Sequence, residues 1–278
     1  ADFTDKAIEQ GACAVLVNPK QQLKAAVPVI PVVDLEQRLA ELGNRFYQQP
    51  SRHLHVVGIT GTNGKTSCSH FIAQALNLLD SPSAVLGTNG YGFLDSLNHA
   101  SHTTPDALYL QQMLSEMTAE GAQNVVMEVS SHALDQQRVA GVFFDQAVFT
   151  NLTRDHLDYH GDMQGYGAAK QKLFTDYGIE RAVINLDDPY AETLLQVIPK
   201  SVTVVGYGLE RSELISRYPA LQPLWIKQSR FSSEGISAKL HTPWGEIEVK
   251  SPILGSFNLS NLMATVAVLI GKGYKPAQ

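Results

Sequence analysis

The residues best suited to chemistry stand in a glycine-rich segment, residues 58–67, with the sequence Gly-Ile-Thr-Gly-Thr-Asn-Gly-Lys-Thr-Ser. An apolar run precedes this segment and a helical pattern follows it. At such a strand-to-helix turn, backbone N–H groups and the helix dipole favour an anion. Lys65 can then reach the outer phosphates of a nucleotide, and the Thr66 hydroxyl can hold Mg²⁺. The general phosphate-loop pattern has glycine where Ile59 stands, so Gly61 must supply the flexibility here. The alternative interpretation of this segment is a glycine-rich turn with an incidental lysine and no bound phosphate.

Two further polar segments follow apolar runs that indicate strands. Glu128 interrupts the run at 124–129, and in open α/β sheets ligands bind at the carboxyl ends of such strands. Its carboxylate can hold Mg²⁺ across from Thr66, or it can cap the helix expected near Ser130. The second segment, 150–161, either suits a transition metal or is a solvated polar loop. Its candidate ligands are Asp155, His156, Asp158 and His160.

Hydroxyl, amide and guanidinium groups elsewhere in the chain are candidates for binding a substrate. Thr103 and Thr104 carry hydroxyls able to grip phosphate or peptide oxygens, although Thr104, followed by proline, is also a typical helix N-cap. Arg138 can pair bidentately with a phosphate or carboxylate, or it is an ordinary surface arginine. Asn258 and Asn261 lie three apart and so share a helix face, while Asn258 alone is also an obvious N-cap.

Alternating strands and helices must position these groups, and this alternation predicts an α/β fold with a phosphate-loop-type, mostly parallel sheet flanked by helices. The expected strands are 54–59, 83–87, 124–129, 145–150, 181–185 and 201–205. The expected helices are 65–79, 104–120, 163–177, 188–198 and 259–270. After residue 220, segments 236–240 and 246–249 predict a small antiparallel hairpin. The first 50 residues predict a separate short α/β piece, with helices at 5–10 and 35–47 and extended segments at 12–17 and 27–33.

Composition argues against several classes of protein. With 44% hydrophobic and 17% charged residues among 278, the chain can bury a packed core. Its net charge of −6, without a block of Lys or Arg, argues against a nucleic-acid partner. No apolar stretch is long enough to span a bilayer and no secretory signal is visible, so we expect no membrane partner. Cys13 and Cys68 are too few for a disulfide framework or a zinc cluster, and we expect free thiols, a cytoplasmic location and a monomer.

The segment Gly61-Thr-Asn-Gly-Lys-Thr66 resembles the ATP loop of the Mur ligases and the related folylpolyglutamate synthases. Enzymes of this kind activate a carboxylate as an acyl phosphate and then let an amine displace phosphate. The resemblance therefore implies ATP and Mg²⁺ as cofactors. The segment 255–261 also resembles the family's segment near the adenine. The implied ATP-binding residues are Gly61, Thr62, Asn63, Gly64, Lys65, Thr66, Ser67, Asn258 and Asn261.

The same resemblance implies catalytic and metal-binding roles. His156 matches a histidine that helps to bind a second Mg²⁺ in Mur ligases, and Lys170 matches the family's carbamylated lysine. A neutral lysine amine can add CO₂ and become an anionic oxygen ligand. Without the resemblance, Lys170 would be interpreted as a solvated surface residue. The implied metal ligands are Thr66, Glu128, His156 and Lys170, and the implied catalytic residues are Lys65, Lys170 and His156.

The stretch 128–138 resembles the part of the tripeptide-forming Mur ligases that holds a UDP-linked muramoyl dipeptide. At His102 the chain departs from the family, which often has asparagine there. The implied substrate-binding residues are His102, Thr103, Thr104, Ser130, Gln136 and Arg138.

Taken over the whole chain, the resemblance implies ATP-dependent addition of a third amino acid to UDP-N-acetylmuramoyl-L-alanyl-D-glutamate in peptidoglycan synthesis. The added amino acid is expected to be meso-diaminopimelate rather than L-lysine. Residues 1–50 are then a remnant of the N-terminal UDP-substrate domain, 51–272 the central ATP-binding domain, and 273–278 the start of a hinge to a C-terminal domain. We expect this chain alone to bind nucleotide weakly without turnover.

Two alternative functions remain at this point. A folylpolyglutamate-synthase-like ligase fits segments 128–133 and 154–160 less well than a Mur ligase does. The other alternative is a nucleotide-binding module without ligase activity. Such a module would need no carbamate, so a functional requirement for Lys170 would favour an enzyme over this module.

Overall fold

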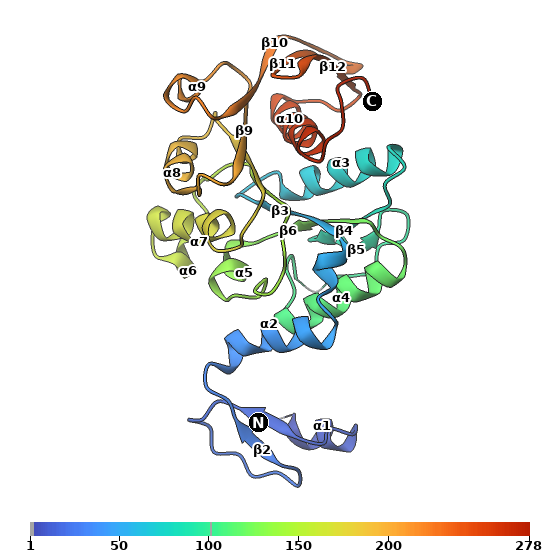
Figure 1. Cartoon of the computed structure of the whole chain (residues 1–278), viewed down its shortest axis with the longest axis vertical. Coiled ribbons are helices and arrows are strands. Elements are labelled where there is room, and N and C mark those ends of the chain that lie inside the picture. The colour runs from blue at the N-terminus through green and yellow to red at the C-terminus, as the bar shows by residue number, and fades with distance from the viewer. Residues whose placement is uncertain (1–2, 101) are drawn as a thin grey trace.

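The computed structural model describes residues 3–100 and 102–278, so Ser101, at the start of the segment expected to precede a substrate-side helix, lies outside the described residues. A small N-terminal unit contains α1 (Thr4–Glu9) and a parallel pair of short strands, β1 (Val15–Val17) and β2 (Val29–Pro31). It lies at one end of the molecule and is joined to the main body by α2 (Leu35–Phe46) (Figure 1). The short α/β piece expected at the N-terminus is therefore present, with its own two-stranded sheet.

One ten-stranded sheet runs through the main body. Its strands are β3 (His55–Thr60), β4 (Ser83–Gly87), β5 (Gly90–Phe93), β6 (Asn124–Glu128), β7 (Gln146–Phe149), β8 (Arg181–Asn185), β9 (Thr203–Gly208), β10 (Gln222–Ser232), β11 (Gly235–Thr242) and β12 (Gly245–Ser251). They lie in the order β12-β11-β10-β9-β8-β7-β3-β6-β4-β5. The neighbours from β10 through to β4 are parallel, whereas β5, β11 and β12 are antiparallel to their partners. This confirms the predicted α/β class with a mostly parallel sheet.

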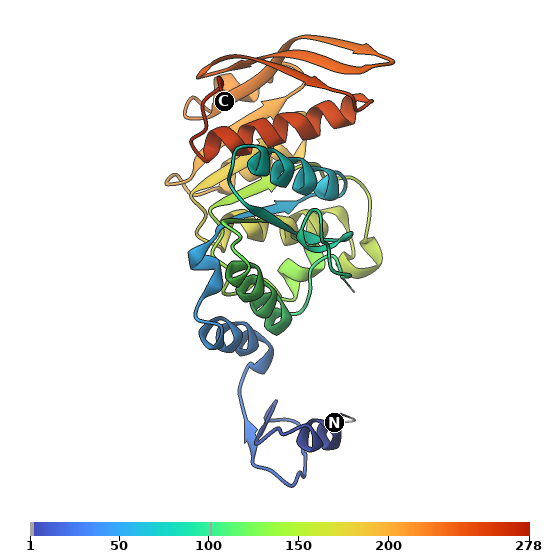
Figure 2. The ribbon, with the colours of Figure 1, turned by 90° about the vertical axis from the view of Figure 1, so that its right-hand side faces the viewer.

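Helices cover both faces of this sheet (Figure 2). One face carries α3 (Lys65–Leu78) and α10 (Ser256–Gly271), which lie side by side. The other face carries α4 (Ala107–Ala119), α5 (Ser131–Asp135), α7 (Met163–Thr175), α8 (Tyr190–Val197) and α9 (Leu214–Arg217). Because side chains alternate across a strand, Val56 of β3 joins the apolar core under α4, and Val57 joins the core under α3 and α10. None of the described helices is long and apolar enough to cross a membrane.

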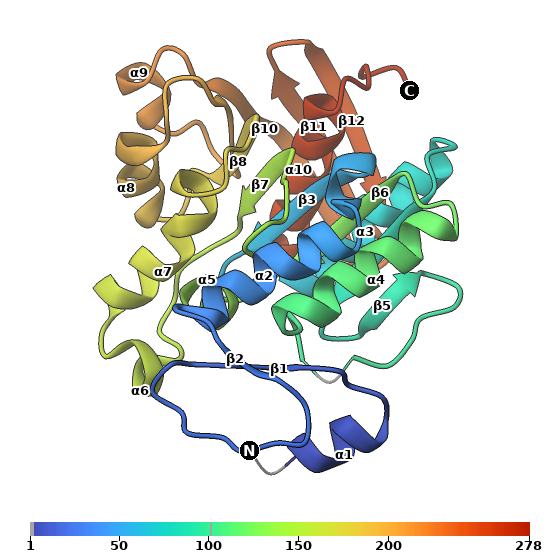
Figure 3. The ribbon, with the colours of Figure 1, turned by 60° about the horizontal axis from the view of Figure 1, so that its bottom comes forward.

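The N-terminal helix α2 lies alongside α4, on the second of these layers (Figure 3). Gly43 permits this close approach, because a Cβ there would lie 3.0 Å from Leu108 Cδ2. The short helices η1 (Pro50–His53) and α6 (Leu157–His160) lie before β3 and before α7. The first of them leads the chain from α2 into the central strand.

Two features of the main body differ from the sequence prediction. The predicted hairpin, β11 and β12, does not stand apart, because β10 joins it to β9 and so to the main sheet. A register shift between Ile226 and Gln228 interrupts the alternation of β10 and hides it in the sequence. The predicted helix start at Thr104 is wrong, since Asp106 is the N-cap of α4 and its carboxylate accepts bonds from two backbone N–H groups.

The central strand β3 pairs with β6 on one side and β7 on the other. All three are parallel, so the loops that follow them emerge at the same edge of the sheet. The connection between β6 and β7 crosses from one side of β3 to the other, which is the topological switch point where open α/β sheets bind ligands. The predicted phosphate loop, Glu128 and the segment 150–161 all lie at this edge.

Candidate active site

The phosphate loop between β3 and α3 requires glycine at two positions. Gly61 and Gly64 have φ angles of 150° and 86°, in a region that other residues rarely adopt. A Cβ on Gly61 would lie 1.9 Å from Thr150 Oγ1, and a Cβ on Gly64 would lie 2.7 Å from Asn261 Oδ1. The loop thus fits between the end of β7 and helix α10, and Ser67 follows it in the first turn of α3.

The segment after β7 clamps this loop through hydrogen bonds. Asn151 Oδ1 accepts from the Asn63 N–H at 2.9 Å, and Asn151 Nδ2 donates to the Asn63 carbonyl at 3.0 Å. Thr150 Oγ1 donates to the same carbonyl at 2.6 Å. Thr62 Oγ1 accepts from the Thr153 N–H at 3.0 Å. The sequence alone does not predict these roles of Thr150 and Asn151, although a polar pair directly after an apolar strand is a signal for them.

Two lysines converge on one carbonyl oxygen of the loop. Lys65 Nζ and Lys170 Nζ each donate to Gly61 O at 2.9 Å, and Lys65 Nζ also donates to Thr62 O at 2.9 Å. Lys170 is 1% exposed, so its interpretation as a solvated surface residue is wrong. Burial, with the positive charge of Lys65, holds the pKa of Lys170 well below its usual value. Burial also lowers the pKa of Lys65, against the opposing effect of nearby carboxylates.

Glu128, at the carboxyl end of β6, is buried beside Thr66. Thr66 Oγ1 donates to Glu128 Oε1 at 2.9 Å, and Thr88 donates to the same carboxylate from its N–H at 2.9 Å and from Oγ1 at 3.2 Å. Carboxylate and hydroxyl oxygens are the donors that Mg²⁺ prefers, so these residues fit the predicted ion. Space is tight, because a Cβ on Gly87 would lie 2.1 Å from Glu128 Oε1. Glu128 does not cap α5, since Ser130 is the N-cap of that helix.

Tyr166 connects His156, Lys170 and the phosphate loop. Its ring centroid lies 6.0 Å from that of His156, and Lys170 Nζ lies 4.3 Å from the same centroid. Its hydroxyl lies 3.2 Å from Thr62 Oγ1. His156 itself is exposed, with a φ of 51°, at the residue that precedes α6. The structure therefore places His156 and Lys170 next to one tyrosine ring beside the loop, and Tyr166 is a site residue that the sequence alone did not predict.

The segment 150–161 does not form a transition-metal centre. Within residues 3–100 and 102–278, no three His, Cys, Asp or Glu side chains are arranged to hold a metal ion. His156 Nε2 lies 3.5 Å from Asp155 Oδ2, whereas His160 Nε2 lies 2.9 Å from Ser131 Oγ, on α5. The interpretation of these residues as one transition-metal ligand set is therefore wrong.

Thr103 and Thr104 lie beside Glu128 but differ in exposure. Thr104 is buried, and its hydroxyl donates to Glu128 O at 2.9 Å while accepting from the Ser130 N–H at 3.2 Å. Thr103 is half-buried, with Oγ1 3.0 Å from Thr88 Oγ1. His102 is exposed. The Thr104 hydroxyl therefore fixes the loop after β6, while Thr103 and His102 lie nearer to solvent.

Arg138 places a positive charge next to these threonines. Its Nη1 donates to Thr104 O at 3.2 Å, and its Nε donates to Gln136 Oε1 at 2.9 Å. Both acceptors are neutral, so neither bond offsets the positive charge of the guanidinium, which can pair with an anionic ligand. Gln136 and Arg138 also line a hollow of about 340 Å³ together with Leu39 of α2. The helix that precedes the main body thus borders the predicted substrate side.

The two asparagines of α10 occupy different environments. Asn261 is 8% exposed and lies against Gly64 of the loop. Asn258 is half-buried, and its Nδ2 donates to Leu254 O at 2.8 Å. The N-cap of α10 is Gly255, so the interpretation of Asn258 as the cap is wrong.

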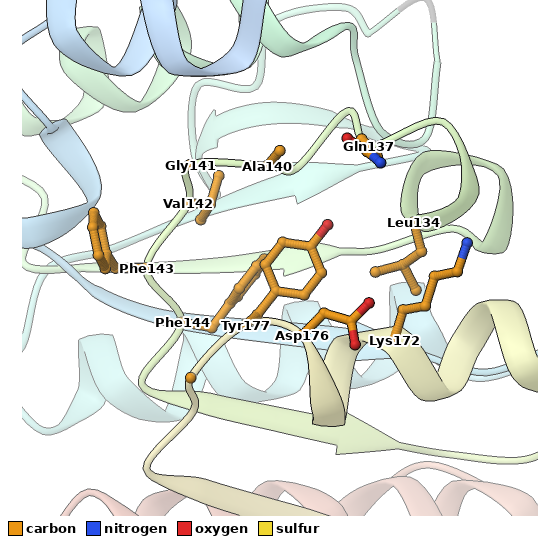
Figure 4. A pocket seen from close by; sticks show the side chains of 11 residues that line it. Leu134, Gln137, Ala140, Gly141, Val142, Phe143, Phe144, Lys172, Asp176 and Tyr177 are labelled. Carbon is orange, nitrogen blue, oxygen red and sulfur yellow. The ribbon is translucent and has the colours of Figure 1, made fainter. Parts of the chain in front are cut away.

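A separate cavity of about 600 Å³ lies between the α5–β7 connection and the end of α7 (Figure 4). Leu134, Phe144 and Tyr177 are among its apolar and aromatic lining residues, and Lys172 and Asp176 add charge. None of the predicted site residues lines it. The candidate active site is therefore the cluster around the phosphate loop.

A mostly parallel sheet, flanked by helices and with a glycine-rich loop after its central strand, defines the class of phosphate-loop α/β domains. The chain belongs to the Mur ligase family, because residues 59–269 match the model of the Mur ligase middle domain.

Individual relatives agree with this assignment. The chain is 45% identical over 275 residues to the UDP-N-acetylmuramoyl-L-alanyl-D-glutamate–2,6-diaminopimelate ligase of Coxiella burnetii, a match that covers 96% of this chain and 55% of the relative. A solved structure of a ligase with the same name has a TM-score of 0.85 at 34% identity, covering 99% of this chain and 54% of that one. The chain spans about half the length of the curated relatives it matches.

More distant structures share only the fold. The folylpolyglutamate synthase of Mycobacterium tuberculosis, complexed with ADP and AMPPCP, has a TM-score of 0.66 at 16% identity. That match covers 85% of this chain and 59% of the other. It supports the fold prediction and carries no information on substrate.

Proposed function

We propose that this chain is the nucleotide-binding part of an ATP-dependent ligase that adds meso-diaminopimelate to UDP-N-acetylmuramoyl-L-alanyl-D-glutamate. The observation that carries the proposal is the convergence of Lys65 and Lys170 on Gly61 O, with Thr66 and Glu128 hydrogen-bonded at the same loop. The diaminopimelate ligases that match nearly the whole chain support the choice of substrate. We further propose that the protein acts as a cytoplasmic monomer.

The phosphate loop binds the triphosphate of ATP in this proposal. Its backbone N–H groups, from Gly61 to Ser67, surround the phosphates, and the dipole of α3 favours their charge. Lys65 turns from the Gly61 and Thr62 carbonyls toward the terminal phosphates. Mg²⁺, when bound to Thr66 and Glu128, would neutralise negative charge on the transferred phosphoryl group.

Lys170 is proposed to act as a carbamate. Its buried, neutral Nζ forms a bond to the carbon of CO₂ and loses a proton to water, which leaves a carbamate whose single negative charge is shared by two oxygens. The Gly61 carbonyl and the Tyr166 ring hold this side chain close to the loop. Together with His156, its oxygens would supply ligands for a second Mg²⁺.

The substrate side is proposed to bind the muramoyl dipeptide. Arg138 presents an unbalanced guanidinium to an anionic group, and Thr103 lies beside the Glu128 cluster. An oxygen of the D-glutamate side-chain carboxylate attacks the terminal phosphorus of ATP, and ADP leaves. The amine of the incoming amino acid then attacks the acyl carbon, and phosphate leaves as the amide forms.

The proposal is tested by phosphate release from ATP in a protein that carries this chain. We expect release to require both UDP-N-acetylmuramoyl-L-alanyl-D-glutamate and meso-diaminopimelate, and to be lost in Lys170→Ala. Equal release with L-lysine would contradict the choice of amino acid. Release with folate and glutamate in place of the muramoyl substrate would contradict the proposed function, and unchanged release by Lys170→Ala would contradict the carbamate.

A further inference from the structure

Cys68 lies directly beneath the phosphate loop, on the side that faces α10. It is 0% exposed, one turn into α3, and belongs to the apolar core between the sheet and the α3–α10 layer. Its Sγ lies 3.4 Å from Asn261 Oδ1 and 3.9 Å from Asn261 O. The Cys68 thiol therefore contacts α10 through two oxygens of a single residue, Asn261.

Asn261 is fixed from several sides. Its Oδ1 lies against Gly64, where a Cβ would come within 2.7 Å. Its backbone carbonyl accepts from Thr265 Oγ1 at 3.0 Å, which anchors the residue within α10. With Oδ1 accepting from the thiol of Cys68, the amide has one rotational orientation. In the described part of the chain Asn261 Nδ2 donates no hydrogen bond, and it lies 3.7 Å from where a Cβ on Gly64 would stand, so this N–H₂ group is a donor beside the phosphate loop.

We propose that Cys68 is a positioning residue for nucleotide binding: its S–H group donates to Asn261 Oδ1 and thereby presents Asn261 Nδ2 to the bound nucleotide. This inference rests on the proposed function. A thiol suits this role because it is a weak donor of nearly apolar character. It can orient the amide from within an apolar core without adding a strongly hydrated group there.

The test is the affinity of the chain for ADP, measured by calorimetry, in variants that differ in the donor at position 68. Cys68→Val removes the donor and keeps the approximate volume, whereas Cys68→Ser keeps a donor. We expect Val to raise Kd for ADP about three- to tenfold, the size of one lost hydrogen bond, and Ser to restore most of the affinity. Cys13→Ser, at the exposed cysteine, is the matched control and is expected to leave Kd unchanged.

A double-mutant cycle separates positioning from a general effect on packing. In an Asn261→Ala background, Cys68→Val should have no further effect on Kd, because the amide it orients is gone. An equal loss in both backgrounds would overturn the inference, as would wild-type affinity in Cys68→Val. If Cys68→Val does not fold, Cys68→Ala takes its place in the same cycle with the same expectations. A wild-type chain that binds no ADP would overturn the proposed function itself.

Discussion

The least ordinary contact between individual residues is the pair of lysine side chains, Lys65 and Lys170, that share one carbonyl oxygen. Buried lysines are costly when charged, and a second lysine nearby adds repulsion. Lys170 is buried and lies near Lys65, and among residues 3–100 and 102–278 its Nζ contacts the Gly61 carbonyl and the Tyr166 ring but forms no hydrogen bond to a carboxylate. A neutral amine relieves this cost, and the neutral amine is also the form that adds CO₂.

The first prediction concerns the pH dependence of stability. Because the pKa of Lys170 is lowered in the folded state, the unfolded chain binds more protons between that lowered value and 10.5. The free energy of unfolding should therefore rise with pH over this window in CO₂-free buffer. Lys170→Met should reduce this slope and stabilise the chain by about 1–3 kcal/mol at pH 7. Urea denaturation at several pH values measures both.

The matched control is Lys172→Met, two residues along the same helix. Lys172 is 36% exposed and pairs with Asp135 at 2.9 Å. Its replacement should leave the slope in place and cost at most about 1 kcal/mol. Equal slopes in the wild type and in Lys170→Met would contradict the burial of an unpaired lysine.

The second prediction concerns the two free thiols. Cys13 is exposed, whereas burial raises the pKa of the Cys68 thiol to about 12. A disulfide reagent at pH 8 should therefore modify one thiol per native chain quickly and the second only upon unfolding. Cys13→Ser should abolish the fast phase. Two equally fast thiols in the native wild type would show that the layer between α3 and α10 is open.

At the scale of elements, the loops after β3, β6 and β7 act as one unit, because side chains of each hold the backbone or side chains of another. Asn151 and Thr150 bind Asn63 from a distance of nearly ninety residues in sequence. The bond from Thr104 to Glu128 O joins the segment before α4 to the end of β6 in the same way. Such contacts fix the shape of the phosphate loop.

The third prediction tests the loop through Gly61→Ala. A methyl group there would meet Thr150 Oγ1 at 1.9 Å, at a φ of 150° that alanine rarely adopts. We expect a loss of about 2–4 kcal/mol in stability and loss of ADP binding. Gly121→Ala is the control, because Gly121 has a φ of 96° with nothing within 4 Å of a Cβ. It should cost about 1 kcal/mol and leave ADP binding intact; similar behaviour of the two variants would contradict the close approach at Gly61.

The sequence predicts the elements of the main body well, since its strands and helices have clear periodicity. It predicts β4 at residues 83–87 and β8 at 181–185 with the observed bounds. It does not predict β10, whose bulge breaks the alternation, or β5, which contains two glycines in four residues. The sequence pattern could not show that β10 joins the hairpin to the sheet, because strand pairing depends on tertiary contacts.

The sequence predicts those residues of the candidate site whose type and position in a motif are enough to imply a role. Lys65 and Thr66 are such residues, and Glu128 stands out as a carboxylate in an apolar strand. Tyr166 and Asn151 were not predictable, because their roles come from contacts with Lys170, His156 and the loop that form only in the folded chain.

At the scale of the whole molecule, the N-terminal unit stands apart from the sheet that holds the site. Among the described residues 3–33, Val17 alone is buried. From α2 onward the chain packs on the main body, and Leu39 even lines the hollow beside Arg138. The packing boundary therefore falls near residue 34, within the segment 1–50 that the sequence predicts to be a remnant of an N-terminal domain.

The fourth prediction follows from this boundary. Deletion of residues 1–33 should shift Tm of the main body by less than about 2 °C, because the deleted part buries little apolar surface. ADP affinity should be unchanged, since no residue of the candidate site is removed. Calorimetry with and without ADP measures both quantities. A decrease in Tm of more than about 8 °C, or loss of ADP binding, would show that the two parts form one cooperative unit.

The proposed function requires that the loop bind nucleotide phosphates, with Mg²⁺ held by Thr66 and Glu128. Calorimetric titration of the chain with ADP, in the presence and absence of Mg²⁺, for the wild type and Glu128→Gln, measures this binding. The amide keeps the shape of the side chain and removes its charge. We expect Mg²⁺ to tighten ADP binding to the wild type about tenfold or more and to have little effect on Glu128→Gln. Absence of ADP binding in the wild type, or the same Mg²⁺ effect in both proteins, would contradict the claim.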